Sequence, residues 1–117
     1  MEHPMTDFYS LMEDTRGLAA ALQSIQLKTT DKQRLHLGQL YTTKGGFLTT
    51  RDKGNRVRGE TVYSCSKIGS YLTAHFGGIG ANDSMMWVGL IKLDKAGNEY
   101  WVMRPEMRAA VASLGWF

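Results

Sequence analysis

The spacing of apolar residues changes along this chain, and that change limits the folds open to it. Between Thr6 and Leu27 apolar residues recur every three or four positions, which predicts an amphipathic helix capped by Thr6. Residues 86–93 and 99–103 are short, β-rich apolar segments that flank a turn sequence, which predicts a hairpin. A chain that contains both patterns is expected to fold as an α+β protein.

The length of 117 residues allows a single small domain, residues 1–117, and no linker or low-complexity segment divides it. One cysteine excludes an intramolecular disulfide framework and a cysteine-rich zinc site. No apolar segment approaches the roughly 18 residues that a membrane span needs. The first ten residues also lack the pattern of a secretory signal. We therefore expect a cytoplasmic protein without membrane contact.

Residues 30–43 carry two competing patterns, and the sequence leaves helix and strand open. The segment from Thr30 to Gln33 has the form of a capping box, which favours a helix that begins at Asp31. Leu35, Leu37 and Tyr41 instead alternate with period two, which favours a strand.

Two further segments, 47–51 and 56–63, are β-rich and flank the loop sequence 52–55. Together with residues 30–43 they favour a three-stranded antiparallel meander. On a strand, Arg56 and Arg58 would point to the same face.

The predicted middle helix begins at Ser64 or Ser66 and ends near Phe76, where two glycines follow. Pro105 is suited to the first turn of a short C-terminal helix that ends at Gly115. The expected order is therefore N-terminal helix, antiparallel meander, middle helix, apolar hairpin and short C-terminal helix.

Charge is distributed unevenly along the chain. Residues 1–27 carry one basic and four acidic residues, residues 28–67 nine basic and three acidic, and residues 68–117 four of each. The chain therefore has an acidic first part, a basic middle of net charge +6 and a balanced last part. A basic segment of this kind is typical either of a solvated surface or of a site for a polyanion.

Our first functional hypothesis is a small, non-enzymatic nucleic-acid-binding or regulatory protein. The predicted phosphate contacts are Lys44, Arg51, Lys53, Arg56, Arg58 and Lys67. Tyr41, Phe47 and Tyr63 interleave with these residues and are candidates for stacking on unpaired bases, although such aromatics are more often core residues. A winged-helix arrangement with residues 66–76 as recognition helix fits the element order, but that helix offers few basic or amide side chains.

Groups that usually carry catalysis or metal binding show no typical spacing here. His3, His36 and His75 are far apart in sequence, and the eleven acidic residues are scattered. Cys65 stands two residues before Lys67, near a predicted helix start, but a buried, inert role is the expected one. The glycines at 77–80 follow a predicted helix, and the segment has neither a third glycine at the spacing of dinucleotide-binding loops nor a Gly-Lys-Ser/Thr ending. We expect no catalytic residues, no metal and no cofactor.

The alternative hypothesis is a protein-binding inhibitor or adaptor, for example of a nucleic-acid-processing complex. Seven methionines and three tryptophans are many for so small a chain, and such residues are enriched at interfaces. The anchors of this apolar surface would be Trp87, Trp101, Trp116 and Phe117, and the same surface would serve a homodimer. In that case the basic segment would bind an acidic protein surface.

Overall fold

The computed structural model describes residues 4–43, 47–48, 56–79, 84–97 and 99–117, with side chains for these except 4–7, 47–48 and 56–60. The fold is α+β, as predicted. The α-helices in the described residues are α1 (Pro4–Glu13), α2 (Thr15–Ile25), α3 (Asp31–Thr42), α4 (Arg56–His75) and α5 (Pro105–Leu114). The remaining elements are the 3-10 helices η1 (Gln26–Lys28) and η2 (Ser84–Trp87), and the strands β1 (Phe47–Leu48), β2 (Gly89–Leu93) and β3 (Glu99–Met103).

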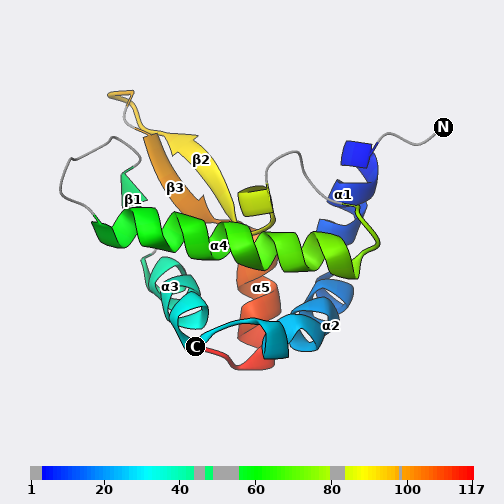
Figure 1. Cartoon of the computed structure of the whole chain (residues 1–117). Helices are drawn as coiled ribbons and strands as arrows, with labels where there is room; N and C mark the ends of the chain where they lie inside the picture. The colour runs from blue at the N-terminus through cyan, green and yellow to red at the C-terminus, as the bar shows by residue number, and fades with distance from the viewer. Residues whose placement is uncertain (1–3, 44–46, 49–55, 80–83, 98) are drawn as a thin grey trace.

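The long helix α4 crosses the front of the molecule in Figure 1 and organises the other elements around it. The sheet lies above one end of α4 and α1 above the other, while α3, α5 and α2 lie below. The strand order is β1-β3-β2 with antiparallel pairing throughout. The predicted apolar hairpin is thus confirmed, with Ile91 opposite Trp101, although its first two residues, 86 and 87, belong to η2 instead of a strand.

The predicted N-terminal helix is divided in two at Asp14. The Asp14 side chain accepts a hydrogen bond from the Gly17 backbone N–H at 3.0 Å and so caps the start of α2. Gly17 therefore stands in the first turn of α2. The predicted cap at Thr6 is wrong because α1 begins at Pro4. The apolar periodicity continues through the break because both helices pack on the same core.

Residues 31–42 are helical, which resolves the choice that the sequence left open. The capping box is complete: the Gln33 N–H donates to Thr30 Oγ1 at 3.1 Å, and the Thr30 N–H donates to Gln33 Oε1 at 3.0 Å. Leu37 is buried but Leu35 is exposed, so the residues of the period-two pattern do not share one buried face.

The predicted strand at residues 56–63, and with it the antiparallel meander, is wrong. These residues form the first two turns of α4, which continues without a break to His75. The helical period is hidden in the sequence because two residues of the buried face, Thr61 and Ser64, are polar. From Cys65 onward, apolar Ile68 and Leu72 continue the same buried face, so only this later part shows a helical pattern.

The predicted C-terminal ends of the middle helix and of the last helix are confirmed, whereas the predicted start of the middle helix at Ser64 or Ser66 is wrong because α4 begins at Arg56. Gly77 and Gly78 leave α4 with φ angles of 70° and 95°, which only glycine adopts readily. Pro105 stands in the first turn of α5, Gly115 follows with a φ of 67°, and the Trp116 N–H donates back to the Val111 carbonyl at 3.4 Å. The chain end then folds onto α3.

Trp87 lies at the centre of the core. Its indole ring meets Phe8 edge-on at a centroid distance of 4.7 Å and stacks on Phe76 at 5.5 Å. Its Nε1–H donates to Thr73 Oγ1 at 2.9 Å, so the one polar atom of the ring is satisfied. The aromatic cluster joins α1, the C-terminal end of α4 and η2.

Among the described helices, none has the length and apolar character needed to cross a membrane.

Candidate nucleic-acid interface

The six predicted phosphate contacts fall into three groups. Lys44, Arg51 and Lys53 lie outside the described residues. Arg56 and Arg58 belong to the first turn of α4, where the backbone is described. Lys67 lies in the middle of the same helix, and its side chain is exposed.

The helical backbone changes how the basic residues are arranged. Residues two apart on a helix are rotated by about 200°, so Arg56 and Arg58 do not share a face as they would on a strand. Arg58 instead has the register of buried Cys65, two turns further along. Arg56 and Lys67 are eleven residues apart, which brings them within about 20° of each other and about 16 Å apart along the axis.

The solvent side of α4 forms a continuous exposed stripe, which we call the α4 stripe. Its described side chains are Tyr63, Lys67, Ser70 and Ala74, and all four are exposed. Arg56 and Glu60 have the same register at the start of the helix. From the start of α4 to its end, the stripe therefore contains two charged residues, a tyrosine, a lysine and two small residues.

Tyr63 and Lys67 are in contact within this stripe. The Tyr63 side chain is 64% exposed, and the Lys67 ammonium nitrogen lies 5.6 Å from the centroid of its ring. An exposed cation–π contact of this kind is weak, about 0.5–1 kcal/mol, so both groups remain available to a ligand. No carboxylate of the described residues forms an ion pair with Lys67.

The opposite side of α4 is closed to solvent. His36 Nδ1 lies 2.6 Å from Ser64 Oγ, and both side chains are buried between α3 and α4. Cys65 is fully buried, and burial raises the pKa of its thiol to about 12. The expected burial of Cys65 is therefore confirmed.

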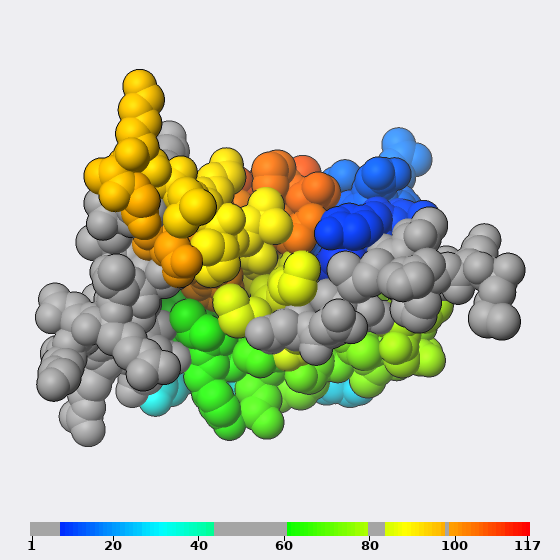
Figure 2. Space-filling model, turned by 90° about the horizontal axis from the view of Figure 1, so that it is seen from above, coloured from blue at the N-terminus to red at the C-terminus, as the bar shows by residue number. Residues whose placement is uncertain are grey.

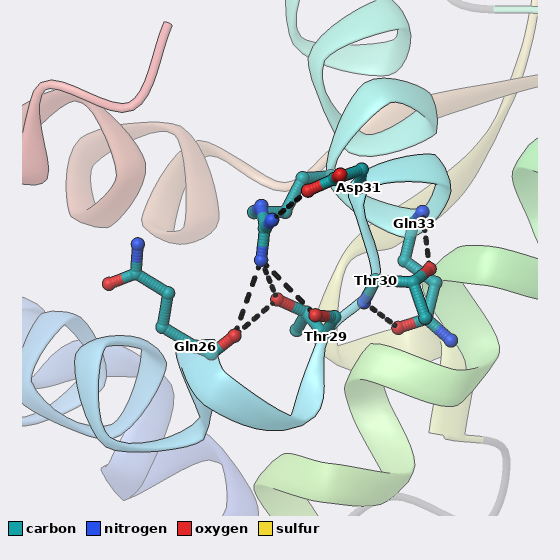
Figure 3. A network of polar contacts seen from close by, with 6 residues as sticks. Gln26, Thr29, Thr30, Asp31 and Gln33 are labelled. Carbon is teal, nitrogen blue, oxygen red and sulfur yellow. Dashed lines mark hydrogen bonds and ion pairs between the residues drawn. The ribbon is translucent and has the colours of Figure 1, made fainter.

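Several other cations are used inside the fold. Figure 3 shows the junction of η1 and α3, where the Arg34 guanidinium pairs with Asp31 and donates to Thr29 Oγ1 at 2.7 Å and the Gln26 carbonyl at 3.3 Å. Arg104 is buried, with its guanidinium 5.6 Å from the Phe8 ring. Both guanidinium groups therefore have partners within the fold, and that of Arg104 is also buried.

The tryptophans of the alternative hypothesis are mostly core residues. Trp87 and Trp101 are buried, so the folded chain presents neither of them to a partner. Trp116 is half-buried, and the ring of Phe117, which is 45% exposed, packs at a tilt against that of Tyr41 with centroids 5.6 Å apart. The chain end thus completes the fold at α3, and the prediction of an apolar surface loses two of its four anchors.

Two features relevant to binding were not predicted from the sequence. Ile91 and Leu93 of β2 are 50% and 69% exposed; the apolar pattern of the hairpin allowed either buried strands or an exposed patch, but it did not single out these two residues. Arg108 of α5 is the second feature, because its guanidinium lies beside β3 and Tyr41. No local motif marks either feature, since both depend on how the hairpin and α5 pack.

Tyr41 is half-buried beneath Arg108, so the structure gives it a packing role. The side chain of Phe47 lies outside the described ones.

No group of three or more metal-ligating side chains lies together in the described part of the chain. Comparisons with family models, with curated proteins and with solved structures found no match. The function is therefore argued from the chemistry of this chain alone.

Proposed function

We propose that this chain binds nucleic acid without catalysis, in the cytoplasm, and that the α4 stripe contacts the backbone and unpaired bases. One observation carries the proposal: Tyr63 and Lys67 are both exposed and lie one turn apart on the solvent side of α4. They belong to the segment 28–67, whose net charge is +6.

The chemistry of the stripe suits a polyanion with planar groups. Lysine and arginine displace counterions from phosphates and so give affinity without sequence preference. An exposed tyrosine offers a face on which an unpaired base can stack, a contact worth about 1–3 kcal/mol per base. Arg56, on the same register as Lys67, would contact a second phosphate along the same strand.

The phosphate contacts of Lys44, Arg51 and Lys53 are proposed from the sequence alone. Lys53 and Arg51 precede Arg56 by three and five residues, and Lys44 precedes β1 by three. Arg58 has the register of the buried face, so we propose a smaller contribution from it than from Arg56. A charge to alanine change at Arg56 is thus expected to weaken binding more than the same change at Arg58.

Fluorescence anisotropy with labelled single-stranded and duplex DNA of the same sequence tests the proposal. Lys67→Gln should weaken binding to both by about threefold to tenfold at low salt, because one phosphate contact is lost. Tyr63→Ala should weaken only the single-stranded complex, because paired bases cannot stack on the ring. Lys95→Gln, at an exposed lysine in the β2–β3 turn, is the matched control. Equal affinities of Lys67→Gln, Tyr63→Ala and Lys95→Gln would reject the proposal.

A second candidate function, protein binding, is favoured by a specific observation on β2. Ile91 and Leu93 stand two residues apart and therefore on one face of the strand, and both are largely exposed. Among the described strands, β2 pairs only with β3 and forms the edge of the sheet. Figure 2 shows the end of this hairpin projecting from the body of the molecule. Exposed apolar edge strands are typical places for a partner or a second copy to bind.

Light scattering separates this candidate from the first. If β2 mediates a homodimer, the wild-type protein should have twice the mass of the chain, and Leu93→Asp should restore the monomer. A monomer whose Leu93→Asp variant captures the same proteins as the wild type would reject an apolar interface on β2. DNA binding by the α4 stripe would be unaffected in either case.

A further inference from the structure

A cavity of about 350 Å³ lies between the β2–β3 hairpin and the first turn of α5. Its volume is at the lower end of those that hold small molecules in proteins. The charged and aromatic side chains that line it are Lys92, Asp94, Tyr100 and Arg108, and the rest of the lining is aliphatic, including Val102. The cavity shares no residue with the α4 stripe.

The sheet register explains why these residues meet. Lys92 and Tyr100 are paired neighbours on adjacent strands, so their side chains share one face of the sheet. Val102 is two residues further along β3 and has the same orientation, whereas Trp101 between them points into the core. α5 follows β3 directly, which places Arg108 against this face.

The Arg108 side chain is held in place before any ligand binds. Its Nη1 donates to the Tyr41 carbonyl at 2.8 Å, and its guanidinium carbon lies 5.2 Å from the centroid of the Tyr41 ring. The Tyr41 carbonyl therefore occupies one edge of the Arg108 guanidinium, and the Tyr41 ring covers one of its faces. Within the described part of the chain, neither Arg108 nor Lys92 forms an ion pair with a carboxylate.

This composition defines a class of ligand. Two cations from different elements, neither paired with a carboxylate of the described residues, favour an oxyanion. Asp94 lines the same cavity and offsets part of the positive charge, which disfavours a polyanion. The aliphatic lining and the Tyr100 ring suit an apolar or planar body. We propose that this cavity binds a small organic anion, with one phosphate or carboxylate group on an aromatic body.

Isothermal titration with four probes tests the proposal and separates the two sources of the anion. Phenyl phosphate and benzoate carry the two anionic groups, benzyl alcohol has the ring without charge, and inorganic phosphate has the charge without a ring. At least one of the first two should bind about tenfold or more tightly than both controls, because charge and ring contribute together. If neither exceeds benzyl alcohol and inorganic phosphate, the proposal is overturned.

Matched variants locate the site. Lys92→Gln should weaken the better probe by about fivefold or more, because a charge-assisted contact is lost. Lys95→Gln, which removes a lysine three residues away that does not line the cavity, should bind the probe as the wild type does. Arg108→Lys keeps the charge but loses the planar fork and should also weaken binding. Because Lys92 is exposed, its variant should fold normally, and unchanged affinity there would overturn the assignment. DNA binding by the α4 stripe should not change in Lys92→Gln, so the two proposals fail separately.

Discussion

Gly69 shows how closely single residues are fitted in this fold. It lies on the buried side of α4, where a Cβ atom would stand 1.8 Å from the Ser84 carbonyl oxygen of η2. No rotamer change relieves a clash with backbone, so α4 and η2 must separate if any side chain is added. The close approach brings Ser66 and Ser84 within hydrogen-bond distance, 2.9 Å between their Oγ atoms.

Gly69→Ala is therefore expected to destabilise the protein by about 1–3 kcal/mol, despite the higher helix propensity of alanine. Urea denaturation measures the change in the free energy of unfolding. Ser70→Ala, at the adjacent exposed position, is the control and should change stability by less than about 0.5 kcal/mol. A Gly69→Ala protein as stable as this control would show that η2 does not pack on α4 as described.

Cys65 gives a prediction about alkaline pH. Burial raises the pKa of its thiol to about 12, so the folded state favours the neutral form. The unfolded chain releases the proton near pH 9, and folding stability should then fall as the pH rises from 9 toward 12. Below pH 9 this group should have no effect on the pH dependence.

The measurement is urea denaturation between pH 8 and pH 11 for the wild type and Cys65→Ala. Above pH 9 the wild type should lose up to about 1.4 kcal/mol per pH unit more than the variant, because one extra proton is bound in the folded state. All other residues are the same in both proteins, so their contributions cancel in the comparison. Identical slopes would contradict a buried neutral thiol.

At the scale of elements, local hydrogen bonds determine that residues 31–42 form a helix, a choice that the spacing of apolar residues left open. The capping box of α3 was present in the sequence as Thr30 and Gln33, and it outweighs the period-two pattern of the leucines that follow. Arg34 adds to this start, because its guanidinium joins the end of η1 to the first turn of α3 (Figure 3). The junction of η1 and α3 is therefore specified by polar residues within nine positions.

Thr30→Ala should lower the free energy of unfolding by about 1 kcal/mol, because both reciprocal hydrogen bonds of the capping box are disrupted. Thr42→Ala, at the exposed far end of α3, is the matched control and should cost less. Thermal or urea denaturation provides the comparison. If the two variants are equally stable, the cap does not determine where α3 begins.

Elements with strong local signals were predicted from the sequence, and those without them were not. The hairpin around residues 94–98 and the boundaries of α5 carry turn glycines and a first-turn proline, and both predictions are confirmed. The first half of α4 was mistaken for a strand because Thr61 and Ser64 occupy its buried face. Their burial is made possible by partners on other elements, such as His36 for Ser64, which sequence spacing does not reveal.

At the scale of the whole molecule, charge segregation was visible in the sequence, but its geometry was not. The basic middle segment is a property of composition, whereas the helical register of α4 decides that Arg56 and Lys67 share a side and that Arg58 does not. The cavity at Arg108 was beyond sequence reasoning, because its lining comes from residues 92–108 and depends on the sheet register. The buried tryptophans likewise form part of the core that closes around α4.

The salt dependence of DNA binding tests the central proposal most directly. The logarithm of the association constant for single-stranded DNA should fall linearly with the logarithm of salt concentration, with a slope of about −0.7 for each phosphate contacted. We expect the wild type to show a slope that corresponds to two or more contacts, and Lys67→Gln to lose about one contact from it. Binding that is absent at low salt, or that is insensitive to salt, would contradict the assignment of the α4 stripe to nucleic acid.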